Sequence, residues 1–372
     1  MHDFFFYGTL CHPPLLETVL GRAVELHPAR LADHAVHWAA GHSFPMILPR
    51  PGAVAEGMLV RGMSDEDVAR LDFYEGGFAY HAHDVAVGTD GTTVTARVFF
   101  PDPGLLDPGA PWSLADWVAE WGEIVVSTAG DFMAAYGERS SEELLARYPQ
   151  MLLRAASRLR ARRGGPAAIR HAAGAEDVAV HARHEPYARF FAVEEYDLRH
   201  RRFDGSMGAL VNRAVFILGD AVTVLPYDPR RDRVMVVEQF RAGPFGRGDA
   251  QPWQLEPIAG RIDAGETPEH AARREALEEA GLALGEMRKV SEYYPSPGAL
   301  NEYLYSYVAL TDLPDDAAGL GGLEDEHEDI RAHVLDFDAL MALVASGEVA
   351  NGPLILTALW LQRERAALRA EE

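Results

Sequence analysis

Short hydrophobic runs, each ended by turn residues, recur through the first part of the chain. The first run is Phe4–Tyr7, and Gly8 ends it. Similar runs that we predict to be strands lie at Met58–Val60, Val85–Val87 and Val94–Phe100. Apolar residues at helical spacing follow in two segments, Leu114–Gly122 and Ser141–Arg163. This part of the chain therefore predicts strands followed by helices.

The second part of the chain has hydrophobic runs on both sides of one well-marked helix. The predicted strands are Phe190–Tyr196, Arg213–Leu218, Ala221–Pro226, Arg233–Gln239 and Tyr303–Val308. The helix has Thr267 as a plausible N-cap, Pro268 in its first turn and Gly281 as its stop. Two more helices are predicted at Asp338–Ser346 and Pro353–Gln362. Strands on both sides of a helix favour a mixed α/β sandwich over a parallel doubly wound sheet.

Three glutamates of that helix, Glu275, Glu278 and Glu279, fall on one arc of its surface. At about 100° per residue, Glu279 lies roughly 40° from Glu275, and Glu278 lies roughly 60° to the other side. Because like charges at this spacing destabilise a bare helix, a divalent cation with oxygen ligands is the expected compensation. The alternative is a solvated acidic face. The Gly-rich lead-in and the apolar remainder of the helix favour the metal site.

Length, charge and cysteine content limit the class of protein. At 372 residues the chain exceeds one ordinary domain. We expect a first domain at 1–161, a linker at 162–175 and a second domain at 176–372. A formal charge of −23 disfavours nucleic acid and anionic membranes as partners. The single cysteine, Cys11, excludes an internal disulfide framework, and no apolar segment is long enough to span a membrane, so we expect a cytoplasmic protein.

The segment from Gly260 to Leu282 resembles the Nudix box. Nine positions over 23 residues fill the pattern G-x5-E-x7-R-E-U-x-E-E-x-G-U, namely Gly260, Glu266, Arg274, Glu275, Ala276, Glu278, Glu279, Gly281 and Leu282. The resemblance implies an α/β/α sandwich that hydrolyses a nucleoside diphosphate linked to another group, with Mg²⁺ or Mn²⁺ as cofactor. It also implies which residues bind the metal, namely Glu275, Glu279, Glu278 (directly or through water) and the carbonyl of Ala259. The implied structural residues of the box are Gly260, Glu266, Arg274 and Gly281.

Outside the box the chain resembles the ADP-ribose pyrophosphatase branch of the Nudix hydrolases. The run Glu238–Arg241 is similar to the strand whose arginine, here Arg241, meets the substrate's phosphates. Pro297 and Gly298, with Glu302 after them, resemble the substrate-binding segment that marks ADP-ribose specificity. The resemblance implies substrate contacts at all four positions.

The most telling match is the acidic loop Gly322–Ile330, which charge alone would assign to solvated surface. In this branch such a loop folds over the metals. Carried over by position, Glu326 is the general base and Glu328 a metal ligand, while Glu279 serves both metal binding and catalysis. The resemblance also implies a homodimer through the Nudix domain, in which residues 186–220 are exchanged between subunits around a Nudix core at 213–372.

The first domain resembles the γ-glutamylcyclotransferase-like family over roughly residues 1–140. The run Tyr7-Gly8-Thr9-Leu10 follows a hydrophobic strand, and the other matching segments are Phe44–Met46, Glu56–Leu59 and Leu71–Gly76. The resemblance implies a mixed β-barrel with helices, a substrate-binding loop at Tyr7, Gly8, Thr9 and Leu10, and Glu75 as the general acid and base. The chain departs from many relatives after Tyr80, where they carry an arginine and it has His81-Ala82-His83.

We therefore expect an enzyme whose second half hydrolyses ADP-ribose to AMP and ribose 5-phosphate. Three alternatives stay open at this point. The same chemistry could act on another nucleoside diphosphate sugar, the first domain could be a γ-glutamylamine cyclotransferase, or the chain could be a non-catalytic nucleotide sensor.

Overall fold

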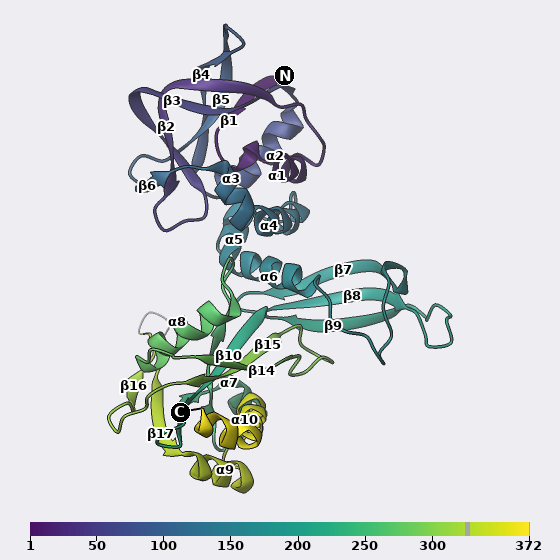
Figure 1. Ribbon diagram of the computed structural model, residues 1–372. Helices are drawn as coiled ribbons and strands as arrows, with labels where there is room; N and C mark the ends of the chain where they lie inside the picture. Colours follow the sequence, from purple (N-terminus) through teal and green to yellow (C-terminus); the bar gives the residue numbers. More distant parts are fainter. Residues whose placement is uncertain (324–327, 372) are drawn as a thin grey trace. The chain divides into compact units, whose positions relative to one another are not determined.

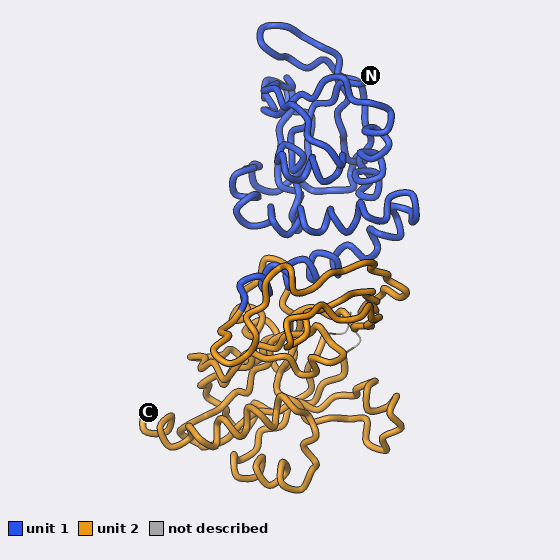
Figure 2. The backbone as a smooth tube through the Cα atoms, turned by 90° about the vertical axis from the view of Figure 1, so that its right-hand side faces the viewer, with its two compact units in different colours: residues 1–164 blue, residues 165–372 orange. Residues whose placement is uncertain are grey.

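The computed structural model of the chain describes residues 1–323 and 328–371. They form two compact units that divide between Gly164 and Gly165 (Figure 2). That division lies inside the stretch 162–175 where a linker was expected, and the extent of the linker stays a prediction.

Unit 1 contains a closed five-stranded barrel (Figure 1). Its strands are β1 (His2–Phe6), β2 (His27–Ala39), β3 (Pro45–Met63), β4 (Tyr80–Thr89) and β5 (Thr92–Pro101). They are hydrogen-bonded in the order β3-β1-β5-β4-β2, and pairing of β2 with β3 closes the ring. Since β1 and β5 run parallel and the other pairs antiparallel, the predicted mixed barrel is confirmed. A short strand, β6 (Pro108–Pro111), adds to β2.

Alternation along β1 gives unit 1 two hydrophobic clusters. Phe5 faces a cluster that draws residues from all five barrel strands, so this cluster is the barrel interior. Phe4 and Phe6 face the other way, into a cluster shared with the helices. The helices of unit 1 are α1 (Pro13–Leu20), α2 (Asp65–Gly76), α3 (Leu114–Trp117), α4 (Glu123–Ala134), α5 (Ser141–Leu145) and α6 (Tyr148–Ala161).

The predicted continuous helix Ser141–Arg163 is wrong, because the structure has two helices there. Helix α5 ends at Leu145, and α6 begins at Tyr148 with Pro149 in its first turn. Proline has no backbone N–H to donate to the carbonyl four residues earlier, here that of Leu145, and its ring crowds that carbonyl, so α5 ends there and a new helix begins.

Unit 2 is built on a mixed eight-stranded sheet with helices on both faces (Figure 1). Its strands are β10 (Asp220–Asp228), β11 (Arg233–Phe240), β12 (Trp253–Glu256), β13 (Ile258–Arg261), β14 (Met287–Tyr293), β15 (Tyr303–Leu310), β16 (Gly319–Gly321) and β17 (Ile330–Asp336). The main order is β14-β15-β10-β11-β17-β16, with β12 paired to β11 and β13 to β10. The β10–β15 pair is parallel, so the sheet is mixed.

Residues of β11 alternate between two hydrophobic clusters that separate the helices of unit 2. Met235 and Val237 pack with α8 (Pro268–Ala280), whereas Val234 and Val236 pack with α9 (Phe337–Ser346) and α10 (Gly352–Ala370). The predicted α/β/α sandwich is therefore confirmed. Helix α10 continues beyond the predicted end at Gln362.

Three further strands form a separate antiparallel sheet at the start of unit 2. They are β7 (Val178–Ala188), β8 (Ala192–His200) and β9 (Val211–Ile217). The remaining short helices of unit 2 are η3 (Ala175–Asp177) and α7 (Ala242–Arg247), while η1 (Thr9–Cys11) and η2 (Val118–Gly122) belong to unit 1. Among the helices formed by the described residues, none is long and apolar enough to cross a membrane.

Substituting Gly57 tests the close approach of β1 and β3 in the barrel. A Cβ at Gly57 would overlap the carbonyl oxygen of Phe6 and come within 2.6 Å of the Phe5 ring. We predict that Gly57→Ala lowers the unfolding free energy of unit 1 by about 1–3 kcal/mol, as overpacking of a core does. Urea unfolding followed by tryptophan fluorescence measures it. The control is Gly88→Ala, whose Cβ meets Arg30 O at an ordinary 3.7 Å. Equal stability of the two variants would show that the approach is not tight.

Candidate active sites

Helix α8 begins and ends at the residues that the sequence indicated. The hydroxyl of Thr267 accepts a hydrogen bond from the backbone N–H of His270, and Pro268 occupies the first turn. Gly281 ends the helix in the left-handed region, with φ of 59°. These two ends fix the rotation of the helix and thereby the direction of its glutamates.

The three box glutamates sit at different depths. Glu279 is 2% exposed, whereas Glu275 and Glu278 are partly buried. The pKa of Glu279 is raised to about 9, first by burial and then by the nearby carboxylates of Glu275 and Glu328. Burial also raises the pKa of Glu275 to about 7, against the opposing effect of the Arg274 guanidinium. The site therefore brings Glu275, Glu279 and Glu328 close enough to repel one another.

Arg274 forms hydrogen bonds with several residues of the box. Its guanidinium donates to both carboxylate oxygens of Glu266, at 3.1 and 3.0 Å, and to the carbonyl of Arg261 at 3.0 Å. The same side chain donates to Glu275 at 2.8 Å and to Glu278 at 3.0 Å. One cation thus serves three carboxylates and holds the loop before the helix against it.

The residues present fit a hard divalent cation. A Cβ at Gly260 would overlap the carboxylate of Glu275, so the backbone there lies directly against a candidate ligand. The adjacent backbone N–H of Ala259 lies 3.4 Å from Glu279 Oε2. All donors at this place are oxygens, which is the set that Mg²⁺ and Mn²⁺ prefer. Within residues 1–323 and 328–371, no three His, Cys, Asp or Glu side chains already surround one point as metal ligands would.

The acidic loop contacts the end of α8. The backbone N–H of Gly322 donates to the carbonyl of Glu278 at 3.4 Å, and a Cβ at Gly321 would overlap the carbonyl of Glu279. Glu328 returns to the loop start, its N–H donating to Leu323 O at 3.2 Å. Glu326, the expected base, lies outside the described residues.

Arg241 lies in the same site and has a buried partner. Its guanidinium donates to Glu256 Oε2 through Nε at 2.9 Å and Nη2 at 2.5 Å. The negative charges of Glu279 and Glu328 also act on Arg241 and raise its pKa. The other oxygen of Glu256 accepts from Asn351 at 3.2 Å, and Asn351 is the N-cap of α10. Sequence reasoning missed Glu256. The signal was a charged residue at the end of a short strand just before the box.

The segment expected to give substrate specificity divides into two parts. Glu302 is partly buried, and burial raises its pKa while Arg261 and Arg241 act in the opposite direction. It therefore shares the electrostatic environment of Arg241. Pro297 and Gly298 lie in an exposed turn next to β9.

Unit 1 has a separate cavity of about 70 Å³ at the end of β1. Its wall combines the expected substrate-binding loop, residues 7–10, with aromatic side chains and Glu75. The lining residues are Phe5, Phe6, Tyr7, Gly8, Thr9, Leu10, Ser43, Phe44, Pro45, Tyr74, Glu75, Phe78, Tyr80, Phe99, Trp117, Val125 and Tyr148. Gly8 is required there, because a Cβ would lie 2.6 Å from Pro45 Cγ. The structure thus brings all five residues predicted for this site together around one cavity.

Glu75 occupies the last turn of α2, which a Ser64–Asp67 capping box begins. Burial raises the pKa of the Glu75 carboxyl to about 7. His81 and His83, which replace the family's arginine, do not line the cavity. Sequence reasoning missed the tyrosines around Glu75, because α2, β4 and α6 supply them from distant parts of the chain.

Comparison with known families finds one family in each of the two units. Residues 4–119 match the family described as Gamma-glutamyl cyclotransferase, AIG2-like, and residues 218–356 match the NUDIX domain.

Curated relatives cover about half of the chain. The ADP-ribose pyrophosphatase of Escherichia coli (strain K12) is 39% identical over 198 residues, which are 53% of this chain and 94% of that protein. The ADP-ribose pyrophosphatase of Haemophilus influenzae is 33% identical over 196 residues, 52% of this chain and 90% of that protein. The GDP-mannose pyrophosphatase of Salmonella choleraesuis is 34% identical over 169 residues, 45% of this chain and 84% of that protein. The chain therefore belongs to the Nudix hydrolases and carries a gamma-glutamyl cyclotransferase, AIG2-like domain at its N-terminus.

Proposed function

We propose that unit 2 hydrolyses the pyrophosphate of a nucleoside diphosphate sugar, and that ADP-ribose is the substrate, giving AMP and ribose 5-phosphate. The observation that carries the proposal is the buried Glu279 beside Glu275 and Glu328. Arg241 interacts electrostatically with Glu279 and Glu328. The relatives named ADP-ribose pyrophosphatase support this choice of substrate.

Mg²⁺ or Mn²⁺ would be held by Glu275, Glu279 and Glu328, with Glu278 and the carbonyl of Ala259 as further ligands. When bound, the metal neutralises the pyrophosphate and lowers the pKa of the attacking water.

The remaining steps fall to the chain's own residues. Arg241 binds a phosphate, and its two hydrogen bonds to Glu256 Oε2 hold its guanidinium in place. Water attacks phosphorus and the bond to the bridging oxygen breaks. Glu326 accepts the proton of the attacking water, a role that rests on its position in the acidic loop.

Two rival functions remain for unit 2. The relative named GDP-mannose pyrophosphatase makes another nucleoside diphosphate sugar the nearest alternative, with the same chemistry. A non-catalytic nucleotide sensor is the other alternative. The complete set of box carboxylates argues against a sensor, which has no need of them.

Replacing Glu279 tests the site. We predict that Glu279→Gln lowers Mg²⁺-dependent ADP-ribose hydrolysis by roughly 100-fold or more, since even outer partners of a metal ligand are worth 10–100-fold. The fold should remain, because the amide has the shape of the carboxyl. Chromatography of the nucleotide products measures the rate, with GDP-mannose as the rival substrate.

The matched control is Glu286→Gln, an exposed glutamate outside the box, which should keep wild-type activity. The Glu326→Gln variant should also lose activity, as the Glu279→Gln variant does. Full activity of the Glu279→Gln protein would remove the assignment of the site.

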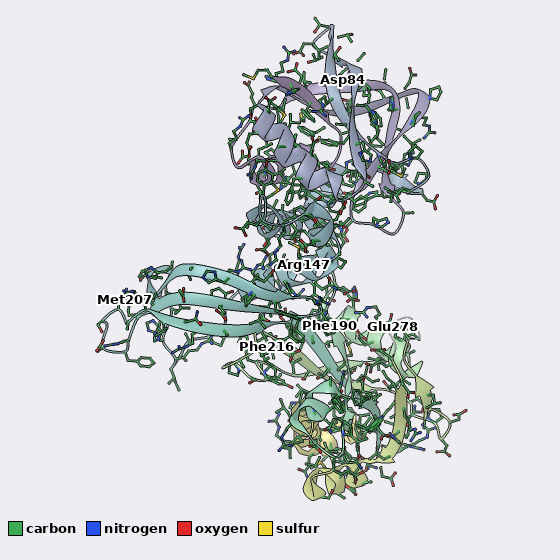
Figure 3. The ribbon with its side chains drawn as sticks, turned by 180° about the vertical axis from the view of Figure 1, so that it is seen from behind. Asp84, Arg147, Phe190, Met207, Phe216 and Glu278 are labelled. Carbon is green, nitrogen blue, oxygen red and sulfur yellow. The ribbon has the colours of Figure 1, made fainter. Side chains whose placement is uncertain are left out.

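A homodimer through the Nudix domain is part of the proposal. Large apolar side chains on the β7–β8–β9 sheet and its loops are exposed, namely Val178, Val180, Tyr187, Phe190, Met207, Leu210 and Phe216. Figure 3 shows Phe190, Met207 and Phe216 spread along this sheet. Such a surface supports an interface with a second copy.

Light scattering measures the mass of the particle. We predict twice the chain mass of 40.8 kDa, and a shift toward the monomer in Val180→Asp, because Val180 is 56% exposed on β7. A wild-type monomer at all concentrations would contradict the dimer.

A second function is favoured for unit 1 by Glu75 in its aromatic cavity. We propose a γ-glutamylamine cyclotransferase. The α-amine of the γ-glutamyl group attacks the side-chain carbonyl carbon, the bond from that carbon to the leaving amine breaks, and 5-oxoproline forms. Glu75 takes the proton from the attacking amine and gives it to the leaving one.

The pH profile tests the role of Glu75. A base must be ionised, and because burial raises the Glu75 pKa to about 7, release of 5-oxoproline should rise with pH through about 7. Glu75→Gln should lower the rate by about 10²–10⁴-fold. The exposed Asp72→Asn on the same helix is the control. A rate independent of pH between 5.5 and 8.5, or an active Glu75→Gln, would exclude this role.

We propose the cytoplasm as the compartment. The lone Cys11 is a buried free thiol, which fits a reducing environment.

A further inference from the structure

Two residues of the cavity wall in unit 1 come from outside the region matched to the cyclotransferase family. That match ends at residue 119, whereas Val125 lies on α4 and Tyr148 is the first residue of α6. Arg147, labelled in Figure 3, marks the chain just before Tyr148. The matched barrel therefore leaves one side of the cavity to be completed by helices that follow it.

Tyr148 is held in the wall from several directions. Its ring meets Phe78 edge-on at 5.0 Å and Phe132 at 6.3 Å. Its hydroxyl is hydrogen-bonded to that of Tyr74. Burial raises its pKa, and the Glu75 carboxylate adds to this shift, which places the phenol in the field of the proposed base. These contacts leave the ring little freedom to move aside for a ligand.

Helix α6 is itself anchored to the body of unit 1. Arg158 donates to Asp131 at 2.6 Å and to Ser127 at 3.1 Å, and both partners lie on α4. Met151, Leu153 and Ala155 are buried on the same helix. A rigid helix thus carries Tyr148, so the ring acts as a fixed wall.

The space behind this wall is small. A cavity of about 70 Å³ compares with about 10–15 Å³ for one water, so it has room for about five to seven water-sized groups, no more than a compact acyl group. The other walls include rings that pack on one another, such as Phe44 against Phe78 and Tyr80. Removing the Tyr148 ring would enlarge the cavity at the side that α6 closes.

We propose that Tyr148 is a specificity-determining residue that limits the leaving amine of a γ-glutamyl substrate to a short chain. The proposal rests on the cyclotransferase function of unit 1. It assigns to α6 the role of completing a binding site that the matched barrel alone leaves open.

The experiment uses the full-length protein and a series of γ-glutamyl-n-alkylamines with ethyl, butyl and hexyl chains. Binding is measured by calorimetry and turnover by release of 5-oxoproline, so that the two readouts are independent. Wild type should prefer the ethyl compound. Tyr148→Ala should shift the preference to the hexyl compound, with its KM or Kd falling at least tenfold relative to that of the ethyl compound.

Two further Tyr148 variants distinguish the effect of the ring's size from a folding defect and from the loss of the hydroxyl. Tyr148→Trp should exclude the butyl and hexyl compounds, and it keeps the test open if the alanine variant does not fold. Tyr148→Phe should keep the wild-type chain-length profile, because only the hydroxyl is lost.

Tyr136→Ala is the matched control. Tyr136 is also a tyrosine of unit 1 in contact with Phe73, yet it does not line the cavity. Its chain-length profile should equal that of wild type.

Each outcome bears on one part of the proposal. An unchanged chain-length profile in folded Tyr148→Ala and Tyr148→Trp would overturn the role of Tyr148 alone. Binding of the series without 5-oxoproline release would overturn the cyclotransferase function, while the size limit would still be read from binding. No binding of any compound by wild type would overturn both.

Discussion

Burial of the Glu279 carboxylate between two other carboxylates is the constraint around which unit 2 is arranged. A charge removed from water is costly, and neighbouring like charges increase that cost. Two arginines offset part of the charge of the cluster: Arg241 from the end of β11 acts on Glu279, and Arg274 from the helix itself acts on Glu275. Arg274 is fully engaged by the box, whereas Arg241 retains an exposed face. The charge that the arginines leave uncompensated is the physical basis of the cation site that we propose for the cluster.

The same logic appears on a smaller scale in unit 1. Glu75 is placed in an aromatic cavity, where its pKa moves into the range in which a carboxyl can exchange protons near neutral pH. In both units a glycine lets the backbone approach the site, Gly260 against Glu275 and Gly8 against Pro45. The two sites nevertheless rest on different folds and stand within separate compact units.

The sequence predicted what depends on local pattern. The caps of α8 and the mixed sandwich were foreseen, because Thr267, Gly281 and the alternating strands carry their signal within a few residues. The barrel was foreseen only through the resemblance of the first domain to the γ-glutamylcyclotransferase-like family. Glu256 and Tyr148 could not be found this way. Each acts through a partner far along the chain, Glu256 through Asn351 and Tyr148 through Tyr74, and only the tertiary structure brings them together. The break before α6 was missed although Pro149 signals it, because the apolar spacing on both sides continues.

The most direct test of the account is ADP-ribose hydrolysis by the full-length protein with Mg²⁺ in water enriched in ¹⁸O, followed by mass spectrometry of the products. The account predicts AMP and ribose 5-phosphate, with one ¹⁸O per turnover in the phosphate of one of them, because water attacks phosphorus. Intact ADP-ribose, or products without the label, would contradict it.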